Sequence, residues 1–173
     1  EEMYPANAAT TVSVARLTTR LCGAYRPGHF DGVTTVVAKL FNIVQPDLAY
    51  FGQKDAQQVI VIRKMVRDLL WPLQIVTCPI IREPDGLAMS SRNAYLSPAE
   101  RKQALCLSAA LRWAREQIEA GQRSVPILIE GMSERVRQAG PCSIDYVEIV
   151  DADELTPKMQ VEADWGELTP LAE

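Results

Sequence analysis

Apolar residues change between helical and strand-like spacing along the first half of the chain. Apolar side chains three and four residues apart predict a helix over 30–44, and a proline ends it. A short apolar run over 48–51, closed by Gly52, predicts a buried strand. A helix over 54–69 and a second buried strand over 73–78 follow. Because two strands joined through a helix pair in parallel, this order predicts a right-handed crossover in a parallel sheet.

The segments on either side of this crossover are expected to form a helix before it and a long loop after it. Thr10 and Thr11 precede a helix-like segment over 12–25, and an Arg-Pro-Gly sequence predicts the end of that helix. Residues 79–93 contain two prolines, a glycine and many polar side chains, which is unlike the interior of a helix or strand. We therefore expect a long loop there and a domain boundary near residue 82.

The second half of the chain predicts two helices and one strand. Ser97 and Glu100 have the spacing of a capping box, with a proline at the first helical position between them. The helix that starts here is expected to end at Ala120, before a glycine. A further helix is predicted over 125–139, and alternating apolar residues over 144–150 predict a half-buried strand.

These elements together indicate an α/β fold class with two domains. Residues 1–82 are expected to form part of a parallel-sheet domain, and residues 83–173 a small α+β domain. A length of 173 residues is sufficient for either one large domain or two small ones with a buried core.

Composition and charge narrow the classes of function. A formal net charge of −4 gives no basic surface for extended nucleic acid, so we expect no nucleic-acid partner. No apolar run approaches the roughly 18 to 20 residues of a membrane span, and no signal peptide opens the sequence. A cytoplasmic protein without a membrane partner is therefore expected. With one histidine and no C-x-x-C motif, the sequence predicts no metal site.

The segment after the first strand is the first candidate for chemistry. Gly52 ends a parallel strand, and ligands bind at the carboxyl ends of such strands. Lys54, close to the start of the next helix, supplies a cation for a phosphate group, and the helix N-terminus favours an anion. Gln58, one turn later, offers a donor and an acceptor to a small polar acid. The alternative is an ordinary turn in which Asp55 caps the helix and Lys54 is solvated.

The second candidate is the polar part of the loop over 86–93. Ser90 and Ser91 are followed by Arg92, so two hydroxyl donors and a guanidinium fork lie together. On a segment that links two domains, such a group suits a mobile phosphate clamp that excludes water. The alternative is a polar linker whose serines satisfy local backbone groups.

Three sequence blocks resemble the pantothenate synthetase family in order and spacing. They are Arg-Pro-Gly-His-Phe-Asp-Gly-Val at 26–33, Phe-Gly-Gln-Lys-Asp-x-Gln-Gln at 51–58, and Arg-Glu-x-Asp-Gly-Leu-Ala-Met-Ser-Ser-Arg-Asn at 82–93. The resemblance covers about 10–150. It implies a partial Rossmann-like nucleotidyltransferase domain followed by a C-terminal lid domain that carries the clamp loop.

The resemblance also implies a reaction, its substrates and its site residues. Such ligases use ATP to convert pantoate into pantoyl-adenylate and then join it to β-alanine, releasing pyrophosphate and AMP. Mg²⁺ accompanies the ATP phosphates, and the enzyme is a homodimer. Catalytic roles are implied for Lys54, Ser90, Ser91 and Arg92, and pantoate binding for Gln58. The implied ATP site comprises Gly52, Gln53, Lys54, Asp55, Ile81, Met89, Ser90, Ser91 and Arg92.

One motif of the family is missing from these residues. The family's early His-x-Gly-His type motif has no counterpart, since His29 is the only histidine. We therefore expect the first half of the nucleotide-binding fold to lie before Glu1 and this polypeptide alone to be inactive. His29 is expected to have a structural role. Two other interpretations stay open: another nucleotidyltransferase of the same superfamily, which activates a phosphorylated alcohol, and a non-catalytic interaction domain that retains the fold.

Overall fold

The computed structural model describes residues 3–162, which divide into two compact units of a mixed α/β protein. The first unit extends to Cys78 and also includes Ala152–Leu155, and the second unit contains the remaining residues from Pro79 onward. The functional domains expected from the sequence, 1–82 and 83–173, stay a prediction. No helix in residues 3–162 has both the length and the apolar character needed to span a membrane.

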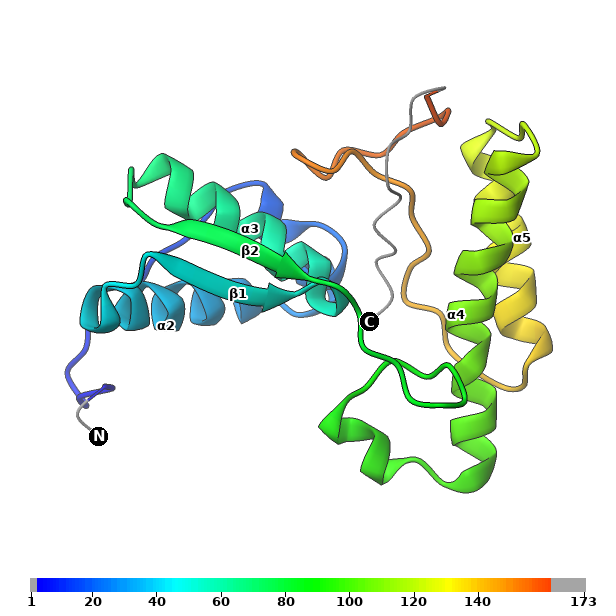
Figure 1. Ribbon diagram of the computed structural model, residues 1–173, viewed down its shortest axis with the longest axis horizontal. Helices are drawn as coiled ribbons and strands as arrows, with labels where there is room; N and C mark the ends of the chain where they lie inside the picture. The colour runs from blue at the N-terminus through cyan, green and yellow to red at the C-terminus, as the bar shows by residue number, and fades with distance from the viewer. Residues whose placement is uncertain (1–2, 163–173) are drawn as a thin grey trace. The chain divides into compact units, whose positions relative to one another are not determined.

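A parallel pair of strands forms the sheet of the first unit (Figure 1). Strand β1 (Leu48–Gly52) pairs with β2 (Gln74–Cys78) in a register that joins Leu48 to Gln74 and Gly52 to Cys78. Helix α3 (Ala56–Asp68) connects them. The strand–helix–strand crossover predicted from the sequence is therefore confirmed.

Helices cover only one face of this sheet. The Phe51 ring of β1 packs edge-to-face on Phe41 of α2 (His29–Val44), with centroids 6.4 Å apart. Its register partner Thr77 accepts a hydrogen bond from Arg63 of α3 at 2.6 Å, so both helices lie on the same face. Both strands lie in front of these helices in Figure 1. Tyr50, which points to the opposite face, is 63% exposed. The prediction of buried strands is therefore wrong, because the described residues cover one face alone.

The two helices bury most of their predicted apolar positions. Phe30, Val37 and Phe41 of α2 are buried, and so are Val59, Ile62 and Val66 of α3. Leu40, Val44 and Leu69 were expected on the same faces but are exposed. These three lie in the C-terminal parts of α2 and α3 or directly after α3, where the two-stranded sheet offers little surface to cover them.

The segment before α2 does not form the continuous helix predicted over 12–25. It contains the 3-10 helix η1 (Leu17–Thr19) and the single turn α1 (Cys22–Tyr25). Arg16 and Leu21 have positive φ values of 72° and 48°, which a right-handed helix excludes. This backbone is held by tertiary contacts rather than by helical hydrogen bonds.

The buried side chain of Gln57 provides the central contact of that segment. Gln57 is 3% exposed, and its Oε1 accepts a hydrogen bond from the Cys22 backbone N–H at 3.1 Å. Its Nε2 donates to the carbonyl oxygens of Leu17 at 3.0 Å and Arg20 at 2.7 Å. One side chain of α3 therefore satisfies three backbone groups of the irregular segment.

The second unit is built on a helical hairpin. Helix α4 (Pro98–Glu119) is followed, after a short turn, by α5 (Val125–Gln138). The capping box predicted at the start of α4 is confirmed: the Ser97 N–H donates to Glu100 Oε2 at 2.8 Å, and the Glu100 N–H donates to Ser97 Oγ at 3.3 Å. Hydrogen bonds from Ser97 are also the largest cause that lowers the pKa of the Glu100 carboxyl.

The core of this unit lies between α4 and α5. Ala114 and Ile118 of α4 pack with Leu128 and Met132 of α5 in one buried cluster. Beside this cluster, Gly131 leaves no room for a side chain because the Trp113 ring fills the space next to its Cα. The guanidinium of Arg135 lies 3.8 Å above the same ring. The first unit has a comparable aromatic contact, Trp71 on Phe41 at 5.7 Å.

The strand predicted over 144–150 is wrong. Residues 143–149 have no regular structure, and Val150 forms only an isolated bridge to Pro157. Proline has no N–H to donate, so this pairing cannot continue as a ladder. The apolar residues of the segment pack against the helical hairpin instead, and the second unit has no strand among its described residues.

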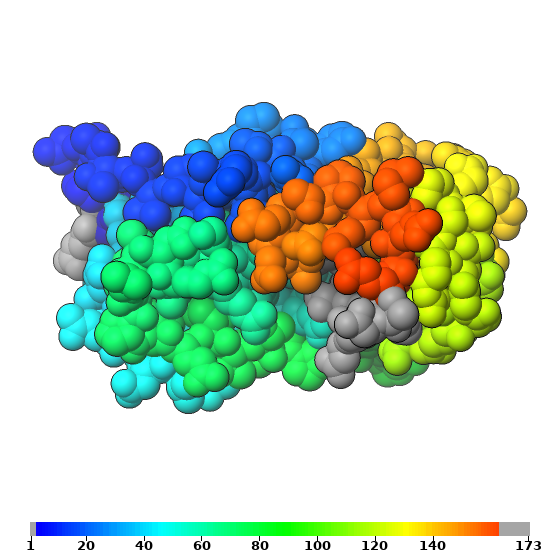
Figure 2. Space-filling model, turned by 90° about the horizontal axis from the view of Figure 1, so that it is seen from above, coloured from blue at the N-terminus to red at the C-terminus, as the bar shows by residue number. Residues whose placement is uncertain are grey.

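The last described residues return to the turn between the two helices. The Val161 N–H donates to the Arg123 carbonyl at 2.9 Å, and the Val125 N–H donates to the Met159 carbonyl at 3.1 Å. Figure 2 shows this segment, in red, against the yellow-green surface of the hairpin. Val161 thereby completes the core of the second unit.

The contacts of Gln57 generate a stability prediction. Gln57→Met keeps the length of the side chain but removes its donor and acceptor, which leaves three backbone groups without their partner. We expect the free energy of unfolding to fall by about 2–4 kcal/mol. Urea denaturation followed by circular dichroism measures this change.

The neighbouring glutamine provides the matched control. The Gln58 side chain is half-buried and makes no hydrogen bond to any described residue, so Gln58→Met is expected to change stability by less than about 1 kcal/mol. Equal effects of the two substitutions would contradict a special structural role for Gln57.

Candidate functional site

The carboxyl end of β1 continues directly into a tight turn. Gly52 is its last residue, Gln53–Asp55 form the 3-10 helix η2, and α3 begins at Ala56. The helix predicted from Lys54 onward therefore starts two residues later. Because the strands are parallel, Gly52 and Cys78 end at the same edge of the sheet, which is the edge where α/β proteins bind ligands.

Lys54 and Asp55 form an ion pair within this turn. Lys54 Nζ lies 3.2 Å from Asp55 Oδ1, and the two side chains are 26% and 46% exposed. Asp55 occupies the N-cap position of α3 but makes no side-chain capping bond. The alternative in which Asp55 caps the helix and Lys54 is solvated does not match this geometry. A partly exposed pair between neighbouring residues contributes little to stability, so Lys54 can exchange its partner for a phosphate at small cost.

The space beside Gly52 is open. A Cβ placed on Gly52 meets no atom within 4 Å, and its φ of −73° is accessible to any residue. The fold therefore does not require glycine at this position. A glycine here leaves the strand-end backbone accessible to a ligand.

Only one of the two adjacent glutamines is available to a ligand. Gln57 is buried and fully hydrogen-bonded, as described above. Gln58 and Gln53 are half-buried. The structural role of Gln57 was not predicted from the sequence, although a signal was present. Gln57 lies four residues before the apolar Val61, on the same helix face, and Val61 is fully buried.

The loop predicted over 79–93 contains an ordered hairpin in the second unit. The Met89 N–H donates to the Ile81 carbonyl at 2.9 Å, and the Glu83 N–H donates to the Leu87 carbonyl at 2.8 Å. Gly86, at the turn, has a φ of 93°, a value that favours glycine. Ile81, three residues after the end of β2, lies in this hairpin and is exposed.

The residues after the hairpin present several polar groups. Ser90 is the N-cap of the 3-10 helix η3 (Ser91–Tyr95), and its Oγ accepts from the Arg92 N–H at 3.2 Å. The Ser90 hydroxyl proton remains available to donate. Ser91 and Arg92 are exposed, and their side chains contact no hydrogen-bonding or charged partner among the described residues. Met89 is also exposed. The linker alternative therefore describes Ser90 but not Ser91.

The predicted site residues fall into two groups. Those from Gly52 to Gln58 belong to the first unit, and those from Ile81 to Arg92 belong to the second. Each group presents polar side chains without strong internal partners. That both groups bind the same triphosphate stays a prediction.

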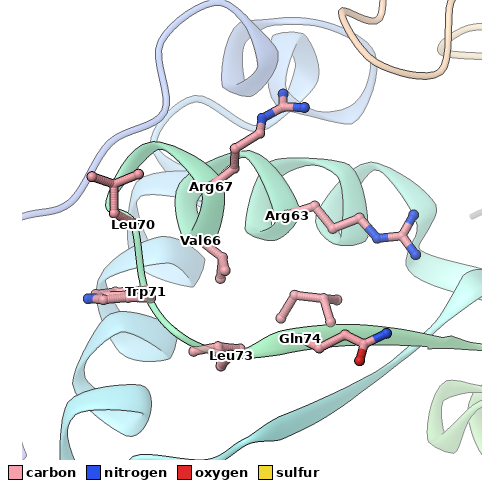
Figure 3. Close-up of a pocket in the computed structure, with 8 residues that line it drawn as sticks. Arg63, Val66, Arg67, Leu70, Trp71, Leu73 and Gln74 are labelled. Atoms are coloured by element: carbon pink, nitrogen blue, oxygen red, sulfur yellow. The ribbon is translucent and has the colours of Figure 1, made fainter.

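A separate hollow lies near the amino end of β2 (Figure 3). Leu73, Gln74 and Ile75 form one side of it, and Arg63, Val66, Arg67, Leu70 and Trp71 complete its lining. In Figure 3 the side chains of Arg63 and Arg67 extend from α3. The hollow is at the opposite end of the strands from Gly52, and none of the predicted site residues lines it.

The carboxylates near these residues do not form a metal site. Among residues 3–162, no group of three or more histidine, cysteine, aspartate and glutamate side chains has an arrangement that could hold a metal ion. Asp55, the carboxylate next to Lys54, is ion-paired with that lysine. These side chains do not fit a protein-bound Mg²⁺, and no chemical step is assigned to one.

Sequence comparison identifies relatives along nearly the whole chain. A family model described as pantoate-beta-alanine ligase matches residues 1–170. The pantothenate synthetase of Moorella thermoacetica is 57% identical over 157 residues, which cover 91% of this chain and 56% of that relative. That of Heliobacterium modesticaldum is 62% identical over 150 residues, which cover 87% and 53%. The chain therefore spans about half the length of the curated relatives it matches.

Solved structures give the same result. The crystal structure of pantothenate synthetase from Thermus thermophilus matches with a TM-score of 0.87 and 49% identity, over 92% of this chain and 58% of that one. The ligase from Francisella tularensis, complexed with beta-gamma ATP and beta-alanine, matches with a TM-score of 0.60 and 32% identity, over 77% and 49%. With the family model, these matches show that the chain belongs to the pantoate-β-alanine ligase family.

Proposed function

We propose that this chain supplies part of the active site for the ATP-dependent condensation of pantoate with β-alanine. The observation that carries the proposal is the match of residues 1–170 to the pantoate-β-alanine ligase family. The geometry supports it, since the two segments with the family's motifs present a cation, hydroxyls and an amide that the fold does not use. The bound ligands of the Francisella tularensis relative also agree with these substrates.

The first group of residues has two proposed tasks. Lys54, with Gly52, Gln53 and Asp55, binds ATP at the carboxyl end of β1, where the ammonium of Lys54 stabilises charge on a phosphate. Gln58 binds pantoate with the amide that remains free on the first turn of α3. The pantoate carboxylate then attacks the α-phosphorus of ATP, and pyrophosphate leaves.

The second group binds the same phosphates in this proposal. Ser90 and Ser91 donate hydrogen bonds to phosphoryl oxygens, and the guanidinium of Arg92 stabilises the departing pyrophosphate. Ile81 contacts the nucleotide through its backbone, and Met89 lies next to it. The amine of β-alanine then attacks the acyl carbon of pantoyl-adenylate and expels AMP.

The proposal also includes the domain type, the oligomeric state and the location of the protein. The β1–α3–β2 crossover is part of a Rossmann-like nucleotidyltransferase domain, and the second unit is its lid. The TM-score of 0.87 to the Thermus thermophilus enzyme supports this. We also propose a cytoplasmic homodimer whose Mg²⁺ arrives with the ATP phosphates.

Removing either cation tests the proposed ATP site. Lys54→Ala and Arg92→Ala are each expected to weaken MgATP binding at least tenfold, or about 1.4 kcal/mol, by isothermal titration calorimetry. Lys102 and Arg112, both exposed on α4, provide matched controls, and alanine at either is expected to leave affinity unchanged. A non-catalytic interaction domain predicts no effect from any of the four.

Gly52→Ala tests whether a ligand approaches the strand end closely. The added methyl group meets no atom of the protein, so we expect the thermal unfolding midpoint to stay the same. If ATP packs against this backbone, the methyl group clashes with it, and MgATP affinity is expected to fall about tenfold. Unchanged affinity would place the nucleotide elsewhere.

The identity of the activated acid distinguishes the ligase from other nucleotidyltransferases. With MgATP, pantoate and β-alanine, the ligase hypothesis predicts pyrophosphate and AMP as products. A phosphorylated alcohol in place of pantoate is expected to give none. The informative protein for this assay is the chain joined to the part of a relative that it does not span.

A further inference from the structure

We propose that Arg101 is a positioning residue that orders the loop 89–92 through Glu83 and Asp85. Arg101 belongs to the first turns of α4 and to none of the sequence blocks that suggested the site. The inference rests on the proposed function of that loop in binding ATP.

Arg101 joins α4 to the hairpin before the loop. Its Nη2 lies 2.6 Å from Glu83 Oε2, and its Nε donates to Asp85 Oδ2 at 2.8 Å. Glu83 stands on the first arm of the hairpin and Asp85 at its turn, so one planar guanidinium holds two points of the hairpin. Arg101 and Glu83 are half-buried, which shields their contact from part of the solvent, whereas Asp85 is exposed.

Asn93 completes the contact from the other end of the loop. Its Nδ2 donates to Glu83 Oε1 at 2.7 Å and to the Ala88 carbonyl at 3.0 Å. Each oxygen of Glu83 therefore has its own partner, one from Asn93 and one from Arg101. The loop 89–92 lies between Ala88 and Asn93, so both of its ends are fixed to this cluster.

The start of α4 fixes the position of Arg101 in turn. Ser97 and Glu100 form the capping box described above, and the Arg101 N–H donates to the Ser97 carbonyl at 2.8 Å. A continuous series of contacts therefore connects the helix cap, through Arg101 and Glu83, to the loop. These contacts tie the loop to α4 within the second unit, and the mobile clamp expected from the sequence stays a prediction.

Arg101 also reduces the repulsion between this cluster and an anion bound by the loop. Two carboxylates beside the loop repel a phosphate, and Arg101 offsets one of them. Hydrogen bonds from Arg101 and then Asn93 lower the pKa of Glu83, while the Leu87 N–H is the largest cause that lowers the pKa of Asp85. Both carboxyls are therefore ionised at neutral pH. Because Arg101 is already engaged with both, it acts on the loop rather than on a phosphate.

Amide hydrogen exchange and MgATP affinity together test this role in the full chain. Arg101→Gln is expected to speed exchange of the Leu87 and Met89 amides at least tenfold and to weaken MgATP binding threefold to tenfold. Arg101→Lys keeps the charge, but lysine has no planar fork to bind both carboxylates. Its MgATP affinity is therefore expected to lie between those of Arg101→Gln and the original chain. The control is Arg115→Gln, which breaks an exposed ion pair with Glu119 on the same helix and is expected to change neither readout.

A double substitution separates positioning from direct contact. If Arg101 acts through the loop, Arg101→Gln weakens MgATP binding less in an Arg92→Ala background than in the original chain. Three results would each overturn the proposal. They are fold-losses of MgATP affinity that multiply in the double variant, unchanged amide exchange in Arg101→Gln, and an Arg101→Lys variant with the affinity of the original chain. If MgATP does not bind even when the chain is joined to the part of a relative that it does not span, the proposed function fails, and amide exchange alone then decides whether Arg101 orders the loop.

Discussion

The parallel pairing of β1 with β2 is the constraint on which the candidate site depends. Parallel strands require a long connection, and α3 provides it on one face of the sheet. The same pairing brings the ends of both strands to one edge. The turn that carries Lys54 starts from β1 at this edge, and the chain leaves β2 there for the hairpin before Arg92. In an antiparallel pairing the two segments would begin at opposite ends of the sheet.

Local signals predicted much of this fold. The helical spacing of α2 and α3 and the capping box of α4 depend on residues close in sequence, and each was confirmed. The failures lie where distant contacts decide the backbone. The segment over 12–25 is shaped by the buried amide of Gln57, and 143–149 pack on a helical hairpin instead of pairing as a strand. No local pattern shows such contacts.

The sequence predicted the residues of the candidate site, but not the residues that hold them in place. Residue types alone suggested that Lys54, Ser91 and Arg92 suit a phosphate, and the structure shows Ser91 and Arg92 without partners among the described side chains. The contact of Arg101 with Glu83 joins residues 18 positions apart across an irregular loop, so neither helical nor strand periodicity indicates it. The residues that bind a ligand follow motifs, while the residues that hold them in place follow from tertiary packing.

The distribution of tryptophan gives each unit its own spectroscopic reporter. Trp71 packs on Phe41 in the first unit, whereas the ring of Trp113 lies beneath the Arg135 guanidinium in the second. The third tryptophan, Trp165, lies outside the described residues. Because indole emission responds to its immediate surroundings, replacing two of the three by phenylalanine yields chains whose fluorescence follows the unfolding of one unit at a time. Such single-tryptophan chains reveal whether the two units melt together or in succession.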